Sequence, residues 1–150
     1  IIAPHEVTTT HIHDLMKWIP GAVKYTTLEN GQHDPNCQVL IIDNIGMLSS
    51  VYQYGKIAYI GGGFGTGIHN TLEAAAFGLP VIFGPEYDKF QEAKDLLALH
   101  AAISISSAEE LYAAFEKLHK DKDAGNTAKK YVLDKTGATA QIIEYLENCV

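Results

Sequence analysis

A glycine-rich turn followed by a short polar motif is the part of the sequence best suited to chemistry. Residues 61–67 hold five glycines in seven positions, and the chain continues through His69 and Asn70 to Glu73. Glycine permits positive φ angles and lets a ligand approach the backbone without a Cβ atom in the way. Amides that converge at such a turn, ahead of a helix N-terminus, are typical of an anion-binding site.

The spacing of these glycines fits neither of the two best-known phosphate-binding motifs. The dinucleotide pattern Gly-x-Gly-x-x-Gly fails because Ile68 or Asn70 stands where its last glycine is required. The P-loop pattern fails because Gly62 and Gly67 have the right separation, but Ile68 and His69 replace its lysine and its Ser/Thr. What remains is the general prediction of an anion bound by exposed amides.

Asn70 and Glu73 admit two interpretations. In the first, Asn70 is an N-cap and Glu73 completes a capping box, which contributes about 1 kcal/mol to helix stability and has no function. In the second, Glu73 lies one turn inside the helix and accepts two hydrogen bonds from a ribose diol, because a carboxylate offers only acceptors. Spacing alone favours the cap, whereas the preceding glycines, which a cap does not require, make the two interpretations equally good.

The elements that must position these residues follow from the alternation of short apolar runs with helical patterns. Strands are predicted at residues 1–3, 22–26, 38–42, 57–60, 81–83 and 101–105. Helices are predicted at residues 9–19, 47–54, 70–77, 90–99, 107–119, 127–134 and 138–146. Residues 121–125 are predicted to be a charged linker.

The repeated strand-then-helix order predicts a parallel sheet covered on both faces, the doubly wound Rossmann-like α/β fold. We expect one domain over residues 1–150, with a helical tail from about residue 107. In such a sheet the ligand lies beyond the carboxyl ends of the strands. The glycine-rich turn and a second loop, residues 86–91, both follow strands at that edge. Lys89 in the second loop either meets a ligand carboxylate or is a solvated surface lysine.

The composition restricts the ligand chemistry and the partners. All eleven cationic side chains are lysines, so an anion must be held by amides, lysine or histidine instead of the guanidinium fork of arginine. The net charge of −7 argues against nucleic-acid binding and against a basic membrane-binding patch. The histidines near the start, His5, His11 and His13, lack the spacing of a metal site, so no metal is expected. Two distant cysteines indicate free thiols in a reducing cytosol.

The sequence GGGFGTGIHNTLEAAAFGLPVIFGP resembles the C-terminal half of 3-deoxy-D-manno-octulosonic acid (Kdo) transferases, as do LIIDNIGMLSSVYQYGKIAYIGG upstream and KFQEAKDLL downstream. The resemblance is strongest from Asp43 to Leu97, and His-Asn-x-Leu-Glu-Ala after a glycine-rich turn is fairly specific within two-domain Rossmann-like (GT-B) glycosyltransferases. The family's members transfer Kdo from CMP-Kdo to a lipid A precursor in bacterial lipopolysaccharide synthesis.

The resemblance implies that the chain is a donor-binding domain that takes CMP-Kdo and needs no cofactor and no metal. It implies an inverting transfer whose catalytic base lies on an N-terminal domain outside this chain, so no catalytic residue is expected in the 150 residues. The full-length protein is expected to act at the cytoplasmic side of the bacterial inner membrane and to bind the lipid A precursor through that N-terminal domain. The present piece is expected to be soluble, with membrane association only through the full-length protein, and inactive alone.

The resemblance also implies a set of nucleotide-binding residues. Gly62 and Gly63 are expected near the phosphate, Asn70 and Glu73 near phosphate and ribose, and residues 43–48 near the nucleotide. The complete expected set is Pro4, His5, Ile45, Gly46, Met47, Gly62, Gly63, Gly65, Gly67, His69, Asn70, Glu73 and Lys89.

Two positions depart from the pattern of the family. Met47 stands where many members have Glu, so a polar contact is lost, and His5 stands where many have Arg. Backbone amides, His5, His69 and Lys89 would then have to hold the anion. Two alternatives stay open. One is a UDP-sugar-using glycosyltransferase or epimerase of the same fold. The other is a non-catalytic interaction domain in which the glycine loop is only a turn and Glu73 only a cap.

Overall fold

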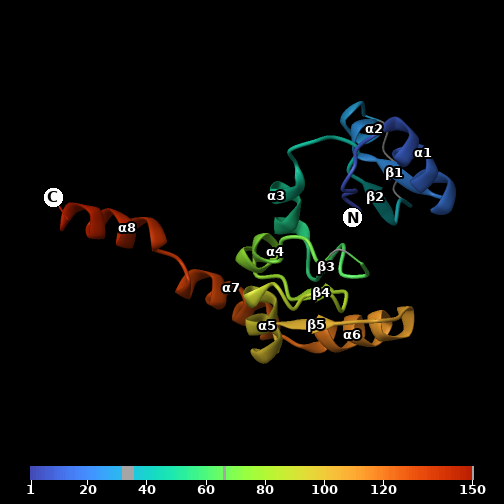
Figure 1. The fold of residues 1–150 in the computed structure, drawn as a ribbon. Helices are drawn as coiled ribbons and strands as arrows, with labels where there is room; N and C mark the ends of the chain where they lie inside the picture. The colour runs from blue at the N-terminus through green and yellow to red at the C-terminus, as the bar shows by residue number, and fades with distance from the viewer. Residues whose placement is uncertain (32–35, 66, 150) are drawn as a thin grey trace. The chain divides into compact units, whose positions relative to one another are not determined.

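The computed structural model describes residues 1–31, 36–65 and 67–149, and Figure 1 shows its ribbon. The chain divides into two compact units, residues 1–53 and residues 54–150, and each is considered by itself. The strand pairs found in the described residues are all parallel, which confirms the predicted α/β class. The single donor-binding domain expected over the whole chain stays a prediction.

The first unit is built around a small parallel sheet. Its elements are α1 (Thr9–Trp18), β1 (Ala22–Lys24), α2 (Tyr25–Glu29), β2 (Val39–Ile41), α3 (Leu48–Val51) and the start of a 3-10 turn, η1 (Tyr52–Tyr54). β1 pairs with one side of β2. Ile2 bridges its other side through bonds from the Ile2 N–H to Leu40 O (2.8 Å) and from the Ile42 N–H to Ile2 O (2.9 Å). Ile12 of α1 packs on this sheet beside Ile41.

The strand predicted at residues 22–26 is wrong in its second half, because α2 begins at Tyr25. The carboxylate of Asp43 accepts hydrogen bonds from the Thr26 N–H at 3.0 Å and from the Thr26 hydroxyl at 2.5 Å. Burial raises the pKa of Asp43, but the hydrogen bonds from Thr26 outweigh it and hold this pKa below its usual value. A carboxylate 17 residues away in the sequence therefore anchors the first turn of α2.

The second unit carries a three-stranded parallel sheet in the order β3-β4-β5. Its elements up to the last strand are β3 (Ala58–Ile60), α4 (Leu72–Ala76), β4 (Val81–Phe83), α5 (Gln91–Ala98) and β5 (Ala102–Ser104). All three residues of β4 are buried. Because successive strand residues point to opposite faces, the central strand is covered on both sides, as its continuous apolar run predicts.

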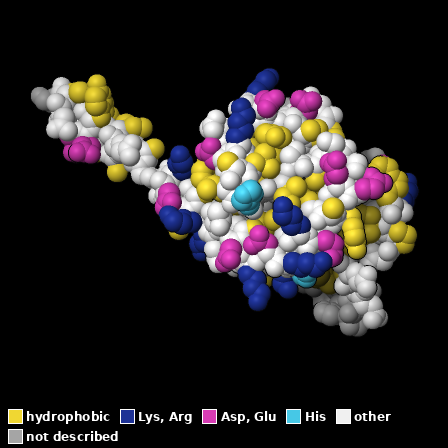
Figure 2. Space-filling model, turned by 90° about the horizontal axis from the view of Figure 1, so that it is seen from below, with side chains coloured by type: hydrophobic (Ala, Val, Ile, Leu, Met, Phe, Trp, Pro, Cys, Tyr) yellow, Lys and Arg dark blue, Asp and Glu magenta, His cyan; other side chains and the backbone are white. Residues whose placement is uncertain are grey.

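Three further helices follow β5, namely α6 (Ala108–Lys120), α7 (Ala124–Asp134) and α8 (Ala138–Glu147). Ser107 is the N-cap of α6, since its side chain accepts from the Glu110 N–H at 3.2 Å. Leu118 of α6 packs with Ile82 of β4, and α7 packs on α4. α8 has no buried residue. Apolar side chains are visible on its surface in Figure 2.

The linker predicted at residues 121–125 is wrong at its end, because α7 begins at Ala124 and not near residue 127. Asp121 accepts hydrogen bonds from the N–H groups of Asp123 (2.8 Å) and Ala124 (2.9 Å), which satisfies amides at the start of the helix. None of the helices in the described residues combines the length and the apolarity that crossing a membrane would need.

Candidate functional site

The glycine turn, residues 61–67, leaves the carboxyl end of β3 as a tight hairpin. The Gly63 N–H donates to Gly67 O at 2.7 Å, and the His69 N–H donates to Gly61 O at 3.1 Å. The φ angles of Gly62, Gly63 and Gly67 are +82°, +79° and +91°. Side chains are strained in that region of φ, so the turn requires glycine at these three positions.

The glycine turn is packed against the loop that follows β4. The Glu86 N–H donates to Gly63 O at 3.0 Å, and the Ser104 hydroxyl donates to Gly84 O at 3.3 Å. A Cβ atom on Gly84 would lie 2.7 Å from Gly63 O. The segments after β3 and β4 therefore meet at one edge of the sheet, as predicted, and Ser104 at the end of β5 contacts them there. The packing role of Gly84 was not predicted, because a Gly-Pro pair at a strand end indicates a turn and does not report a close approach to another loop.

The side chains of Asn70 and Glu73 are hydrogen-bonded to each other at the N-terminal end of α4. Asn70 Oδ1 accepts from the Leu72 N–H at 2.9 Å, and Asn70 Nδ2 donates to Glu73 Oε1 at 2.9 Å. Both side chains are exposed. The prediction of Asn70 as the N-cap is wrong by one residue, because Thr71 occupies that position without a side-chain cap. Asn70 nevertheless satisfies an amide of the first turn, so the capping interpretation is partly right.

The N-terminus of α4 is a weaker anion site than the sequence indicates. The helix has only five residues, where eight were predicted from residue 70 to residue 77. Its macrodipole is correspondingly small, and the Leu72 N–H is already bound by Asn70. An anion at this edge would therefore have to be attracted by amides of the glycine turn other than the Gly63 N–H, which is bonded to Gly67 O, and by nearby side chains.

His69, Gly65 and Lys89 complete the predicted residues in this unit. Gly65 lies in open space, since no heavy atom would be within 4 Å of a Cβ built on it. The His69 ring lies beside Gly61, with Cδ2 3.5 Å from the position of a Cβ on that glycine. Lys89 is exposed in the loop after β4. The structure thus brings Gly62, Gly63, Gly65, Gly67, His69, Asn70, Glu73 and the loop of Lys89 to the carboxyl edge of β3 and β4.

The other predicted residues belong to the first unit and also follow strand ends. Pro4 and His5 come after the Ile2 bridge, and Ile45, Gly46 and Met47 come after β2. Ile45 is 88% exposed. Gly46 has a φ of +93°, and the thioether of Met47 accepts from Asn44 Nδ2 at 3.1 Å. Their roles in nucleotide binding stay predictions.

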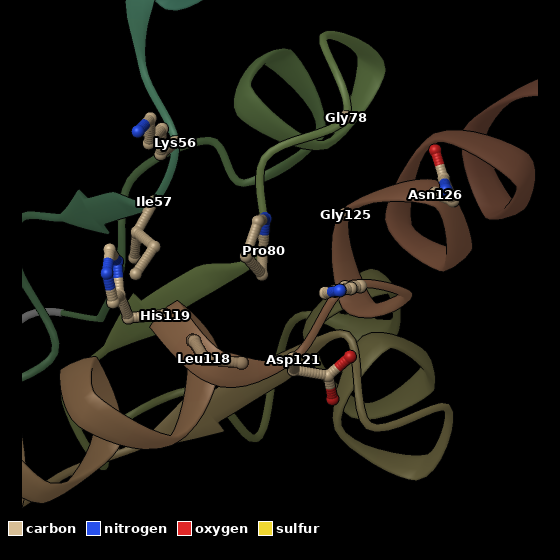
Figure 3. A pocket seen from close by; sticks show the side chains of 10 residues that line it. Lys56, Ile57, Gly78, Pro80, Leu118, His119, Asp121, Gly125 and Asn126 are labelled. Atoms are coloured by element: carbon tan, nitrogen blue, oxygen red, sulfur yellow. The ribbon is translucent and has the colours of Figure 1, made fainter.

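A cavity at the opposite edge of the second unit is not the predicted site. It has a volume of about 300 Å³ and is lined partly by Lys56, Ile57, Pro80 and His119, as Figure 3 shows. Ile57 and Pro80 directly precede β3 and β4, so the cavity lies at the amino ends of the strands. Within the described ranges, no three His, Cys, Asp or Glu side chains are placed to hold a metal ion.

The sequence is related to known transferases over part of their length. It is 43% identical to a 3-deoxy-D-manno-octulosonic acid transferase of Rickettsia bellii over 52% of this chain and 19% of that protein. It is 37% identical to the protein of the same name from Aquifex aeolicus over 68% of this chain and 28% of that protein. The matched segment thus spans less than a third of either relative. No family model matches the chain.

A solved structure has the same fold. The C-terminal CMP-Kdo binding domain of WaaA from Acinetobacter baumannii matches with a TM-score of 0.67 and 20% sequence identity, over 84% of this chain and 68% of that one. The relatives in sequence and this structure agree with the family that the sequence resembles. The chain is therefore a relative of the 3-deoxy-D-manno-octulosonic acid transferases, and it has the fold of the C-terminal domain of WaaA.

Proposed function

We propose that this chain is the donor-binding part of a glycosyltransferase that transfers Kdo from CMP-Kdo. The observation that carries the proposal is the exposed Glu73 carboxylate, fixed by Asn70 beside the glycine turn within the segment matched to Kdo transferases. The structurally similar domain is itself a CMP-Kdo binding domain, which supports the same donor.

Two sets of groups in the site would bind different parts of the donor. The amides of the glycine turn, together with His69 and Lys89, would face the phosphate, because no arginine is present. Glu73 would accept hydrogen bonds from the ribose hydroxyls. Preorganised amides also stabilise the negative charge that grows on the departing CMP as the bond to Kdo breaks.

The rest of the reaction is proposed from the resemblance. A hydroxyl of a lipid A precursor attacks the anomeric carbon with inversion, and CMP leaves without help from a metal or a cofactor. The general base lies in a part of the protein outside this chain, so the chain alone binds donor but transfers nothing. The full-length protein works at the cytoplasmic face of the inner membrane.

Calorimetric titration of the chain with CMP, UMP and UDP tests the donor. We expect CMP to bind more tightly than UMP and UDP. Tighter binding of UDP would instead support a UDP-sugar enzyme of the same fold, and no binding of any nucleotide would support an interaction domain.

The Glu73→Gln variant tests the carboxylate within the same titration. Glutamine exchanges one acceptor oxygen for an NH2 group, so CMP affinity should fall by about 1–3 kcal/mol while the unfolding midpoint stays unchanged. Glu144→Gln on the exposed helix α8 makes the same charge change and serves as the matched control. Unchanged CMP affinity in Glu73→Gln would leave Glu73 as part of a helix cap only.

A further inference from the structure

Asn70 uses both ends of its amide, and this arrangement assigns it a role in the site. Its Oδ1 accepts from the Leu72 N–H, and its Nδ2 donates to Glu73 Oε1, both at 2.9 Å. We propose that Asn70 is a positioning residue that fixes the carboxylate of Glu73 for the ribose hydroxyls and does not itself bind the nucleotide. This inference rests on the proposed function.

The orientation of the Asn70 amide is determined by its neighbours. The Leu72 N–H can only donate, so the atom that faces it must be the oxygen of the amide. The NH2 group then has to face Glu73, where the reversed amide would place an oxygen against a carboxylate. The backbone beneath the pair is held in place because Thr71, which lies between Asn70 and Leu72, is fully buried.

The bond leaves Glu73 able to bind a diol. A carboxylate has about four lone-pair sites, and Asn70 occupies one of them on Oε1. Oε2 and the second lone pair of Oε1 remain available for two hydroxyl groups. Glu73 is exposed, so without Asn70 its long side chain would sample several rotamers and would lose that freedom when a ligand binds.

Two substitutions separate positioning from capping. Asn70→Ser keeps an uncharged acceptor for the Leu72 N–H, because serine is a good capping residue, but its side chain is too short to reach Glu73. Asn70→Ala removes both interactions. We expect Asn70→Ser to retain the unfolding midpoint of the wild type, and Asn70→Ala to lower it slightly.

The experiment measures the affinities of CMP and 2′-deoxy-CMP for four proteins: the wild type, Asn70→Ser, Glu73→Ala and the double variant. The wild type should prefer CMP by about tenfold, the effect of one hydrogen bond to the missing hydroxyl. Asn70→Ser should lower CMP affinity by about 3- to 10-fold and reduce this preference. In the Glu73→Ala background, Asn70→Ser should not lower the affinity for CMP any further.

The outcomes distinguish the positioning role from the proposed function. If Asn70→Ser lowers CMP affinity by the same factor with and without Glu73, Asn70 contacts the nucleotide directly and the positioning role is wrong. If it lowers the affinities of both nucleotides equally, Asn70 acts on a part of the nucleotide other than the 2′-hydroxyl and the positioning role is wrong. If it lowers neither affinity, Asn70 is only a cap. If the wild type does not distinguish the two nucleotides, or Glu73→Ala binds CMP normally, the ribose role of Glu73 fails and the positioning role fails with it.

Discussion

The backbone of Gly63 lies directly against the backbone of Gly84. A Cβ atom on Gly63 would be 2.8 Å from the Cα of Gly84, and a Cβ on Gly84 would be 2.7 Å from Gly63 O. The Glu86 N–H closes the contact with a hydrogen bond to Gly63 O at 3.0 Å. Part of the glycine content of the turn is therefore explained by contact between two loops, whether or not a ligand is present.

Gly84→Ala should destabilise the second unit by about 1–3 kcal/mol, because the new methyl group would overlap Gly63 O and the ring of Phe64. Urea unfolding followed by circular dichroism measures the change. Gly65→Ala in the same region is the matched control, since its Cβ meets no heavy atom within 4 Å. Equal midpoints for the two variants would show that the packed contact is absent in solution.

Gly125→Ala should also destabilise the protein, although alanine is the better helix former by about 1 kcal/mol. Gly125 is the second residue of α7, and a Cβ on it would lie 2.3 Å from Gly78 O. Asn126→Ala, at the next and exposed position, should be neutral or slightly stabilising. A higher thermal midpoint for Gly125→Ala would contradict the contact between α7 and the turn after α4.

Tyr131→Phe should destabilise the protein in a pH-dependent way. The Tyr131 hydroxyl donates to Asp95 Oδ2 at 2.8 Å and joins α7 to α5. Burial, followed by the bond to Asp95, raises the pKa of Tyr131 to about 12 from 10.0. The pKa of Tyr131 is higher in the folded state than in the unfolded state. The contribution of Tyr131 to the free energy of unfolding is therefore complete below pH 10 and is lost as the pH rises towards 12.

The stability difference between wild type and Tyr131→Phe should therefore shrink between pH 10 and pH 12. Urea midpoints of both proteins at several alkaline pH values measure it, and the comparison removes the titration of the lysines that both share. A difference that stays constant across this range would mean that Tyr131 is not held protonated by the fold.

Removal of α8 should change the stability of the rest of the chain by no more than about 0.5 kcal/mol. None of its residues is buried, and Ile142, Ile143, Tyr145 and Leu146 are all at least half exposed. A chain ending after Thr136 tests this by thermal unfolding. A chain ending after Asp123 is the contrast, because it also loses Ala124 and Ala128, which are buried in α7. A large loss of stability in the chain ending after Thr136 would show that α8 packs on the rest of the fold.

Most of the fold could be predicted because its strands are short, continuous apolar runs. β4 is the clearest case, since all three of its residues are buried. α2 could not be predicted, because Tyr25 and Thr26 favour a strand and the carboxylate that holds them in a helix belongs to Asp43. The predicted start of α7 is too late because Gly125, after a run of charged residues, is typical of a linker. In the structure this glycine instead allows the close approach of α7 to Gly78.

The position of the site could be predicted, but not its internal bonding. The order of the elements was enough to place the glycine turn at the carboxyl edge of the sheet. The spacing of Asn70 and Glu73 left open whether they cap the helix or bind a ribose. It did not predict the hydrogen bond between their side chains, because that bond depends on side-chain rotamers. The contact of Gly63 with Gly84 joins residues from two different loops, and no local pattern reports it.

The central claim is that a cytidine nucleotide binds at the glycine turn. The most direct test is a titration of the 15N-labelled chain with CMP, followed by 1H–15N correlation spectra. We predict the largest shifts at the amides of Gly62, Gly63, Gly65 and Gly67 and at the side-chain amide of Asn70, with α8 unaffected. No shift at saturating CMP would contradict the account, as would shifts confined to the opposite edge, at the cavity that contains Asn126.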